Sequence, residues 1–210
     1  MTQQIEQGTQ EWHQLRLGKV TASRISDVLS KIKSGESASR KNYKMELVVE
    51  RLTGLKTESY TSPAMQWGID NEGLARSEYE VRNNVLVDQV PFVNHYNIKN
   101  AGCSPDGLVG NLGMVEIKCM TTANHVDAIL NDKPPSQYIA QCQFQLACTG
   151  RLWNDLTLFD PRLPDILQLK VFRIERDDEF IKAMEEEVIQ FLKEVDEITN
   201  NLKGIKNGRV

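Results

Sequence analysis

The segment CSPDGLVGNLGMVEIKC, residues 103–119, limits most narrowly what this chain can fold into. Its second half alternates apolar residues with Glu116 and Lys118, and this two-residue period predicts a β-strand with both charged side chains on one face. The SPDG sequence favours a sharp bend, and Gly-Asn-Leu-Gly predicts a turn that folds the first arm back along the second. We therefore expect a hairpin that brings Asp106, Glu116 and Lys118 together at one end.

The rest of the chain predicts helices first and strands afterwards. Thr9 is expected to cap a first helix that ends at Gly18, and Thr21 a second one. A third helix is expected over 43–53, and Ser62-Pro63 favours the start of a fourth that runs to about Asn83. Strands are predicted at 85–93, 96–102, 113–119, 151–159 and 166–174, with a helix over 137–150 and an acidic amphipathic helix at the end. This order predicts an α+β or mixed α/β fold with a central sheet flanked by helices.

Composition narrows the class of protein. The chain has 210 residues, of which 40% are hydrophobic and 26% charged, as in ordinary globular domains. No apolar run approaches the roughly 18 residues of a membrane helix, and the polar start MTQQIEQGTQ is not typical of a signal peptide. Four cysteines without a CxxC pair and only three histidines argue against a zinc site. We expect a cytoplasmic protein with buried free thiols, although Cys103 and Cys119 flank the hairpin and could approach each other.

Charge is unevenly distributed along a chain whose net charge is −4. Residues 16–56 carry ten basic and four acidic residues, a net +6, whereas 175–197 carry ten acidic and three basic residues, a net −7. Such polarity could present one basic surface to an anion while the far side stays acidic. Two solvated helix faces of opposite sign explain the charge pattern equally well.

The hairpin residues favour metal chemistry. Two carboxylates held close together repel unless a cation lies between them, and hard oxygen ligands suit Mg²⁺ or Mn²⁺. A divalent ion stabilises charge on a phosphodiester and activates water, and an adjacent lysine can hold that water. The alternative is a hairpin with a Glu–Lys pair on its solvent face. Glu72 adds a third carboxylate, because it falls within a small and apolar stripe of the fourth helix. Gln137, Gln141 and Gln145 form a polar stripe on their own helix, which could orient a water or a lysine or could simply face solvent.

An anion site is predicted near the start of the chain. Arg16 closes the first helix, and Thr21 and Ser23 open the second, where free backbone N–H groups and hydroxyls could bind a phosphate. Simple capping by Thr21, with Arg16 on the surface, is the alternative. The loop 31–41 could lie along a nucleic-acid backbone or merely be solvated.

With these residues in place, the chain resembles the phage recombination exonucleases of the lambda exonuclease type, in the PD-(D/E)xK nuclease superfamily. The resemblance covers nearly the whole chain. It rests on EWHQLRLGKVTAS, MQWGIDNEGLAR, CSPDG, EIKC, YIAQCQ and DPR, in this order. It implies a restriction-endonuclease-like core and a processive 5′→3′ exonuclease that uses two Mg²⁺ ions, with Mn²⁺ as a possible substitute. The substrate implied is linear double-stranded DNA with a 5′-phosphate end. The products implied are mononucleotides and a 3′ single strand. The resemblance also implies a toroidal homotrimer that works with a single-strand annealing protein in a phage-infected or lysogenic bacterium.

The resemblance also assigns roles to residues by motif. Asp106, Glu116 and the backbone carbonyl of Ile117 would bind metal, and Glu72 would hold the second ion or its waters. Lys118 would position the nucleophilic water, and Gln141 would support that arrangement. The residues implied for the terminal 5′-phosphate and for DNA are Arg16, Thr21, Ser23 and Lys33.

We accordingly expect one nuclease domain over residues 1–210. It would comprise N-terminal helices and a basic loop (1–60), a catalytic core (61–175) and an acidic C-terminal helix (176–210). The sequence leaves three alternatives: an endonuclease on the same core, a catalytically silent scaffold that binds DNA ends, and a Mg²⁺-dependent phosphatase acting on small molecules. The Arg16, Thr21 and Ser23 group favours recognition of DNA ends over an endonuclease. The intact set of Asp106, Glu116 and Lys118 argues against a catalytically silent scaffold. The basic region 16–56 argues against a phosphatase acting on small molecules.

Overall fold

Helices and strands alternate along the chain in the computed structural model, which describes residues 5–57 and 61–206. Residues 1–4, 58–60 and 207–210, which include both ends of the expected 1–210 domain, lie outside the described part. The helices are α1 (Gln10–Arg16), η1 (Ala22–Arg24), α2 (Ile25–Leu29), α3 (Ala38–Thr53), α4 (Pro63–Asn83), α5 (Thr122–Asn131), η2 (Ser136–Tyr138), α6 (Ile139–Thr149), α7 (Asp165–Gln168) and α8 (Asp178–Lys206). The strands are β1 (Val20–Thr21), β2 (Val87–Asp88), β3 (Val93–Asn94), β4 (Ala101–Cys103), β5 (Gly107–Val109), β6 (Gly113–Lys118), β7 (Trp153–Phe159) and β8 (Leu169–Glu175).

The strands form two mixed sheets. The larger has the order β2-β5-β6-β7-β8, in which β6 and β7 run parallel and the other neighbours run antiparallel. The smaller has the order β1-β4-β3 and carries the segment that follows α1. The expected α/β fold with a central mixed sheet flanked by helices is confirmed.

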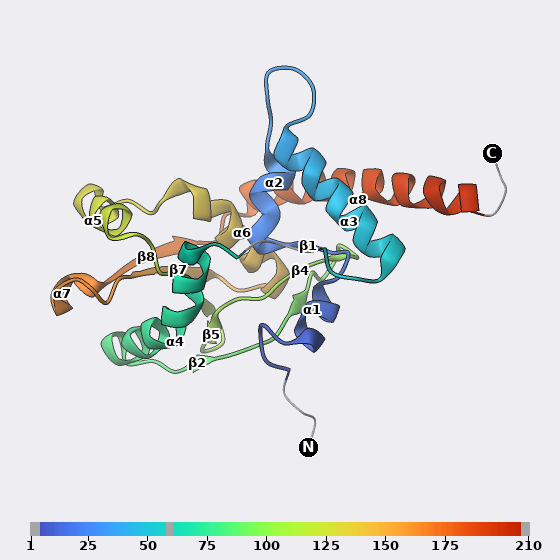
Figure 1. The fold of residues 1–210 in the computed structure, drawn as a ribbon. Helices are drawn as coiled ribbons and strands as arrows, with labels where there is room; N and C mark the ends of the chain where they lie inside the picture. Colours follow the sequence, from blue (N-terminus) through green and yellow to red (C-terminus); the bar gives the residue numbers. More distant parts are fainter. Residues whose placement is uncertain (1–4, 58–60, 207–210) are drawn as a thin grey trace.

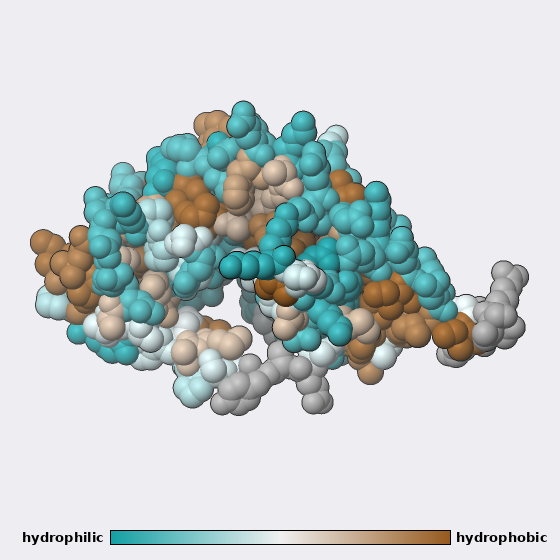
Figure 2. Space-filling view, turned by 90° about the horizontal axis from the view of Figure 1, so that it is seen from above, coloured by the Kyte–Doolittle hydropathy of each residue, from teal (hydrophilic) through white to brown (hydrophobic). Residues whose placement is uncertain are grey.

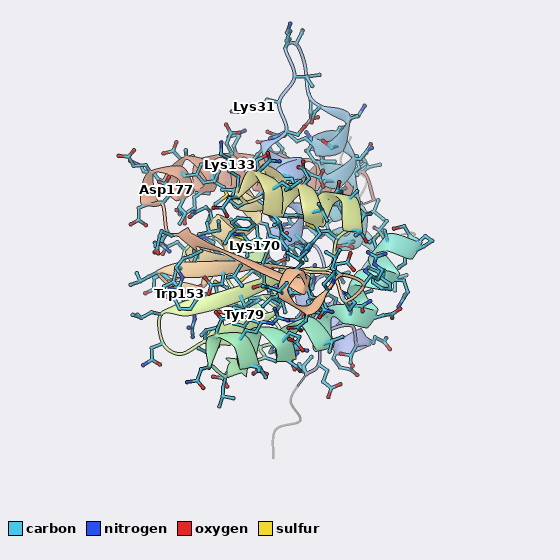
Figure 3. The ribbon with its side chains drawn as sticks, turned by 90° about the vertical axis from the view of Figure 1, so that its left-hand side faces the viewer. Lys31, Tyr79, Lys133, Trp153, Lys170 and Asp177 are labelled. Atoms are coloured by element: carbon cyan, nitrogen blue, oxygen red, sulfur yellow. The ribbon has the colours of Figure 1, made fainter. Side chains whose placement is uncertain are left out.

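Helices cover both faces of the larger sheet. Ala75 and Tyr79 of α4 pack with Val115 and Ile117 of β6 on one face. On the other face, α5 and α6 pack against β7 and β8. Figure 3 shows these layers edge-on, with α4 below the strands and α5 above them. Because alternate residues of β6 face opposite layers, Glu116 and Lys118 point to the α6 side while Val115 and Ile117 point to α4.

A second hydrophobic cluster joins the helices of the N-terminal third to the C-terminal helix. Side chains of α2, α3, α6 and α8 share it with β1 and β4. At its centre, Tyr43 of α3 stacks on Phe191 of α8 with ring centroids 5.6 Å apart. Figure 1 shows α8 running behind α2 and α3 and extending past them. This cluster fixes the small sheet, and with it α1, against α6.

Several expected helix boundaries are confirmed. The Thr9 side chain accepts a hydrogen bond from Trp12 N at the start of α1, and Ser62 caps α4 with Pro63 in its first turn. Gly150 ends α6 with a φ of 69°, a left-handed conformation that glycine adopts readily.

Other expectations were wrong. Thr21 makes no capping hydrogen bond and instead belongs to β1, whose strand runs directly into η1. The single strand expected at 85–93 is two short strands, β2 and β3, in different sheets, because Pro91 cannot donate to a ladder. Residues 166–168 lie in the short helix α7 instead of a strand, and α5 was not foreseen at all.

The basic and acidic regions of the chain face each other. Arg40 and Lys44 of α3 both bind Glu194 of α8, and Arg51 binds Asp196. Lys31 binds Glu187 of the same helix. The expectation of a basic face turned to an anion and a separate acidic face turned to solvent is therefore wrong for these four bases. Opposite charges on two packed helices neutralise one another before they can attract an external ion.

The four cysteines are free, as expected, and three of them are buried. Cys103 of β4 and Cys148 of α6 belong to the same buried cluster, and burial together with Cys103 raises the pKa of the Cys148 thiol. Among the described residues, no helix combines the length and the apolar composition needed to cross a membrane.

We predict that the α3–α8 ion pairs make stability depend on pH in the acid range. Hydrogen bonds from Arg40 and Lys44 lower the pKa of Glu194 from 4.5 to about 2. A lowered carboxylate pKa contributes stability that is fully present above pH 4.5 and is lost as pH falls toward 2. Glu194→Gln should therefore lower the free energy of unfolding by about 1 kcal/mol at pH 7, a value reduced by solvent screening.

Urea unfolding at several pH values measures this effect. The difference between wild type and Glu194→Gln should shrink between pH 4.5 and 2. Glu197→Gln, an exposed change on the same helix, is the matched control and should leave stability unchanged. A difference for Glu194→Gln that stays constant down to pH 2 would contradict the assignment.

Candidate active site

The hairpin of β5 and β6 brings Asp106 beside Glu116. Gly107 lies opposite Val115 in the antiparallel register, so Asp106 comes next to position 116 just as β5 begins. Beyond this point β6 has no partner from β5. The Ile117 N–H donates to Asp106 Oδ2 at 2.6 Å. Because the N–H and C=O of one strand residue point to the same side, the carbonyl of Ile117 faces this free edge too.

Glu116 is buried, with 2% of its surface exposed. Its Oε1 lies 2.7 Å from Lys118 Nζ and also accepts from Gln141 Nε2. Its Oε2 accepts from Gln145 Nε2 at 2.5 Å. The alternative of a Glu–Lys pair on a solvent face is therefore wrong: this pair lies under α6, and every carboxylate oxygen has a donor.

Glu72 reaches the same place from α4. It lines a cavity of about 500 Å³ together with Asp106, Ile117 and Lys118. Arg76, one turn further along α4, lies 3.7 Å from Glu72 and donates to the backbone carbonyl of Asp106 at 3.3 Å. The structure thus brings all five residues expected in the catalytic group around one end of β6: Glu72, Asp106, Glu116, Lys118 and Gln141.

The carboxylates at this cavity oppose one another's ionisation. Burial raises the pKa of Asp106 well above its usual range, and the charges of Glu116 and Glu72 raise it further. Burial also raises the pKa of Glu72, although Arg76 partly offsets the effect. A cation among these oxygens would relieve both the burial cost and the repulsion.

Lys118 is held in its charged form. Burial by itself would lower the pKa of Lys118, but Glu116 and Asp106 outweigh burial, and the pKa is raised. Lys118 Nζ also lies 5.1 Å from the centroid of the Tyr138 ring, whose face attracts a cation. The side chain is therefore suited to donate hydrogen bonds to a water or a phosphate, and poorly suited to take up a proton.

The donor set fits a hard divalent ion. Carboxylate and carbonyl oxygens predominate at this end of β6, and neither sulfur nor imidazole is needed. As arranged within 5–57 and 61–206, no three His, Cys, Asp or Glu residues are grouped to hold a metal ion. Lys118 and Gln141 contact Glu116 Oε1, and the Ile117 N–H donates to Asp106 Oδ2. Each carboxylate has a further lone pair with which it could bind an ion.

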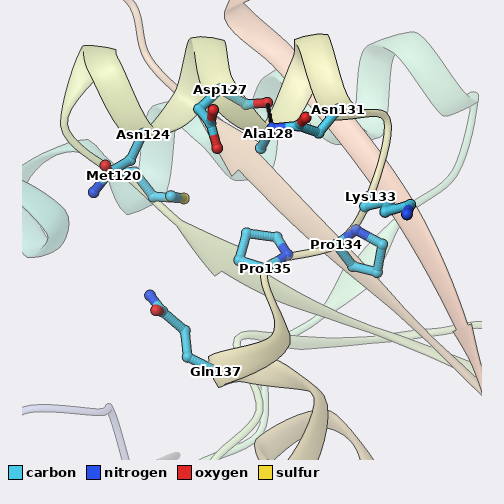
Figure 4. A pocket seen from close by; sticks show the side chains of 9 residues that line it. All are labelled: Met120, Asn124, Asp127, Ala128, Asn131, Lys133, Pro134, Pro135 and Gln137. Atoms are coloured by element: carbon cyan, nitrogen blue, oxygen red, sulfur yellow. Dashed lines mark hydrogen bonds between the residues drawn. The ribbon is translucent and has the colours of Figure 1, made fainter.

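A smaller cavity of about 380 Å³ adjoins the first and shares Met120 and Asn124 with it. Figure 4 shows it between α5 and the segment around Pro134 and Pro135. Gln137 lines this second cavity and so does not join Gln141 and Gln145 at Glu116. The predicted glutamine stripe is thus divided between two places.

Arg16, Thr21 and Ser23 come together as expected. Arg16 Nη2 lies 3.5 Å from Ser23 Oγ, and Thr21 Oγ1 lies 3.4 Å from Ser23 Oγ. Arg16 Nη1 donates to Ser104 Oγ at 3.2 Å, and its guanidinium lies over the Trp12 ring. Burial lowers the pKa of Arg16, but a guanidinium stays protonated in proteins. A half-buried cation surrounded by hydroxyls is a suitable anion site.

Lys33 lies apart from this group. It is exposed in the turn between Lys31 and Glu36, which form an isolated β-bridge. This turn projects from the body above α2 in Figure 1. Seen from above, the surface around it is mainly hydrophilic (Figure 2).

Sequence reasoning missed Ser104, and it placed Gln145 in a polar stripe without giving it a role at Glu116. Ser104 joins Arg16, and the signal available was its place directly before Pro105-Asp106. Gln145 bonds to Glu116, and the signal was its spacing of four from Gln141, which puts both side chains on one face of α6. Neither signal by itself distinguishes a contact from solvent exposure.

Comparisons with known proteins agree with this geometry. A family model described as a YqaJ-like viral recombinase domain matches residues 11–152. None of the curated proteins matches the sequence.

Solved structures extend the similarity over nearly the whole chain. The crystal structure of an alkaline exonuclease (LHK-Exo) from Laribacter hongkongensis is 44% identical, with a TM-score of 0.90, and the match covers 96% of this chain and 100% of that chain. A structure of LHK-Exo in complex with dAMP matches with a TM-score of 0.89, the same identity and the same coverage. A phage-related exonuclease from Haemophilus somnus 129PT shares the fold, with a TM-score of 0.71 at 17% identity over 90% of this chain and 98% of that chain.

Proposed function

Because the chain belongs to the YqaJ-like viral recombinase domain family, we propose that it is a Mg²⁺-dependent 5′→3′ exonuclease acting on double-stranded DNA. It degrades the 5′-phosphorylated strand processively to mononucleotides and leaves 3′ single-stranded DNA for recombination by strand annealing. Its 44% identity to an alkaline exonuclease supports the coarser statement that it is a nuclease. The complex of that relative with dAMP is consistent with a mononucleotide product.

One observation carries the proposal: three carboxylates and a lysine from distant parts of the chain meet at one cavity. Glu72 comes from α4, Asp106 from the start of β5, and Glu116 and Lys118 from β6. A fold gains no stability from clustering buried carboxylates that raise one another's pKa. Such a cluster is typical of a site that binds cations.

The residues divide into those that hold metal and those that act on the substrate. Asp106, Glu116 and the Ile117 carbonyl would hold one Mg²⁺, and Glu72 would hold a second ion or its waters, with Mn²⁺ as a substitute. Bound there, the ions would supply an activated water and would stabilise charge on the phosphodiester. Lys118 donates hydrogen bonds that position the attacking water and stabilise the phosphate oxygens, and Gln141 keeps the Lys118–Glu116 pair in place.

The Arg16 group would bind the terminal 5′-phosphate. Arg16 faces the hydroxyls of Ser23 and Ser104, with Thr21 behind Ser23. Ser104 and Asp106 are two residues apart, so their Cα atoms are separated by at most about 7 Å. A terminal phosphate at Arg16 would therefore lie about one nucleotide from the metal-binding carboxylates. This spacing favours an exonuclease over an endonuclease on the same core.

The proposal includes the partners that the family resemblance implies. These are linear duplex DNA with a 5′-phosphate, a single-strand annealing protein, two further copies of the chain in a ring, and a cytoplasmic site of action in the bacterial host. Lys33 would contact the DNA backbone from its projecting turn. Closure of a ring around the duplex would slow dissociation and so make digestion processive.

We predict that the wild-type protein with Mg²⁺ digests a linear 5′-phosphorylated duplex from its 5′ ends. A label at the 5′ end should be released as mononucleotide at once, a label at the 3′ end should stay on the strand, and a closed circular duplex should remain intact. Lys118→Ala should lower the cleavage rate by about 10²- to 10³-fold, as loss of one donor to a developing charge does, while duplex binding stays nearly unchanged. Gel analysis of both labels and a filter-binding assay measure these effects.

Lys170→Ala is the matched control, because Lys170 pairs with Asp132 on the surface and should not affect cleavage. Cleavage of the circle would show an endonuclease. Binding to ends without any cleavage by wild type would show a scaffold. Equal loss of binding and cleavage in Lys118→Ala would contradict the proposed role of Lys118.

We predict that Arg16→Ala removes most of the preference for 5′-phosphorylated over 5′-hydroxyl ends. A hydrogen bond to a charged group contributes about 1.5–3 kcal/mol, which corresponds to roughly a 10- to 100-fold change in the ratio of the two initial rates. The ratio is measured on otherwise identical duplexes. Arg24→Ala is the matched control, because Arg24 is paired with Asp27 and Glu46 and should leave the ratio unchanged. An unaltered ratio in Arg16→Ala would exclude this phosphate site.

A further inference from the structure

A chain of buried amides lies behind Glu116, on the side away from the cavity. Gln145 of α6 donates from Nε2 to Glu116 Oε2 at 2.5 Å. Asn154 of β7 donates from Nδ2 to Gln145 Oε1 at 2.7 Å. Gln145 and Asn154 have no exposed surface, and Glu116 has 2%. Three polar side chains from β6, α6 and β7 thus form one continuous hydrogen-bonded line in the core.

The line has a fixed direction. A primary amide donates from its nitrogen and accepts at its oxygen. With Asn154 donating to the oxygen of Gln145, the nitrogen of Gln145 must point to Glu116. Reversal of the Gln145 amide would set two nitrogens against each other at Asn154 and a carbonyl oxygen against the carboxylate at Glu116. Asn154 therefore keeps the Gln145 donor directed at Glu116 Oε2, which fixes the orientation of that carboxylate.

The two oxygens of Glu116 have different surroundings. Oε1 is contacted by Lys118 and Gln141, and Lys118 lines the cavity. Oε2 is contacted by Gln145, which is fully buried. An ion that enters through the cavity can displace contacts at Oε1 and leave the bond at Oε2 intact. The carboxylate would then keep its orientation during the exchange.

We propose that Gln145, braced by Asn154, is the positioning residue that holds the Glu116 carboxylate in place for a divalent cation. The proposal rests on the proposed function and adds to it a residue outside the set expected to bind metal or substrate. Hydrogen-bonded partners of metal ligands act in this way in other metal sites, by orienting the ligand and tuning its basicity.

The amide chain is poorly explained by stability alone. Buried polar atoms normally have partners, yet among the described residues Asn154 Oδ1 is buried without one. A core selected for stability would gain by replacing Asn154 and Gln145 with apolar residues of similar size. The retained amides are instead what a buried carboxylate needs if it must be held in one orientation.

The test is Mn²⁺ binding to the full chain, measured by electron paramagnetic resonance and by calorimetry in the absence of DNA. Gln145→Met keeps the length of the side chain and removes its donor. We expect it to weaken Mn²⁺ binding by about 10- to 100-fold, the range found when such partners are removed. Cleavage of linear duplex should fall at low Mn²⁺ and recover toward the wild-type rate at saturating Mn²⁺, because the metal ligands themselves are intact.

Gln143→Met is the matched control. Gln143 is also a buried glutamine of α6, but it donates to the Glu175 carbonyl and accepts from the Asp177 N–H. Its substitution should lower the melting temperature and leave the Mn²⁺ affinity unchanged. Equal loss of affinity in both variants would reduce Gln145 to a general packing role and overturn the proposal.

The remaining outcomes are also decisive. Wild-type affinity in a folded Gln145→Met protein would overturn the proposal while leaving the proposed nuclease function standing. If Gln145→Met does not fold, Asn154→Val decides: removal of the brace should weaken Mn²⁺ binding by a smaller factor, and unchanged affinity would overturn the proposal. A wild-type protein that neither binds Mn²⁺ nor cleaves DNA would refute the proposed function itself.

Discussion

The buried carboxylate of Glu116 is the constraint on which the rest of the site depends. It lies in the middle of the larger sheet at the point where β5 leaves β6, and each of its oxygens has a donor. Lys118 comes from the same strand, so that contact follows from the two-residue period alone. The glutamine donors require α6 to pack at one particular height along β6, and this packing is set by the apolar clusters on either side of α6.

The ion pairs between α3 and α8 change how the charge of the chain must be understood. A net charge of −4 with a basic N-terminal third could have indicated an open cationic surface. Much of that positive charge is instead neutralised by α8, so the proposed DNA contacts are limited to a few bases, such as Arg16 and Lys33. Tight binding to DNA would then depend on closing a ring, in which several weak contacts act together.

The sequence predicted local features well and distant contacts poorly. The hairpin of residues 103–119 and the start of α4 at Ser62 follow from turn and capping chemistry, which a short window contains. The helix α5 was missed although five of its ten residues are apolar, because a helix of fewer than three turns gives a weak periodic signal. Ser104 was missed, and the contact of Gln145 with Glu116 was not predicted, for a different reason. Their partners lie 88 and 29 residues away, so only the packed fold shows which polar side chain has a buried function.

The segment 104–106 would link the proposed end recognition to the proposed catalysis through covalent geometry. Ser104 contacts Arg16, and Asp106 lines the cavity shared with Glu72 and Lys118. The N-terminal helix is fastened to this segment, because Trp12 donates to Ser104 and Gln7 to the Pro105 carbonyl. The distance between the Arg16 group and the cavity is therefore set largely by two peptide units. A terminal phosphate bound at Arg16 would hold the scissile bond at the same distance from the DNA end at each step, which is what the proposed mononucleotide product requires.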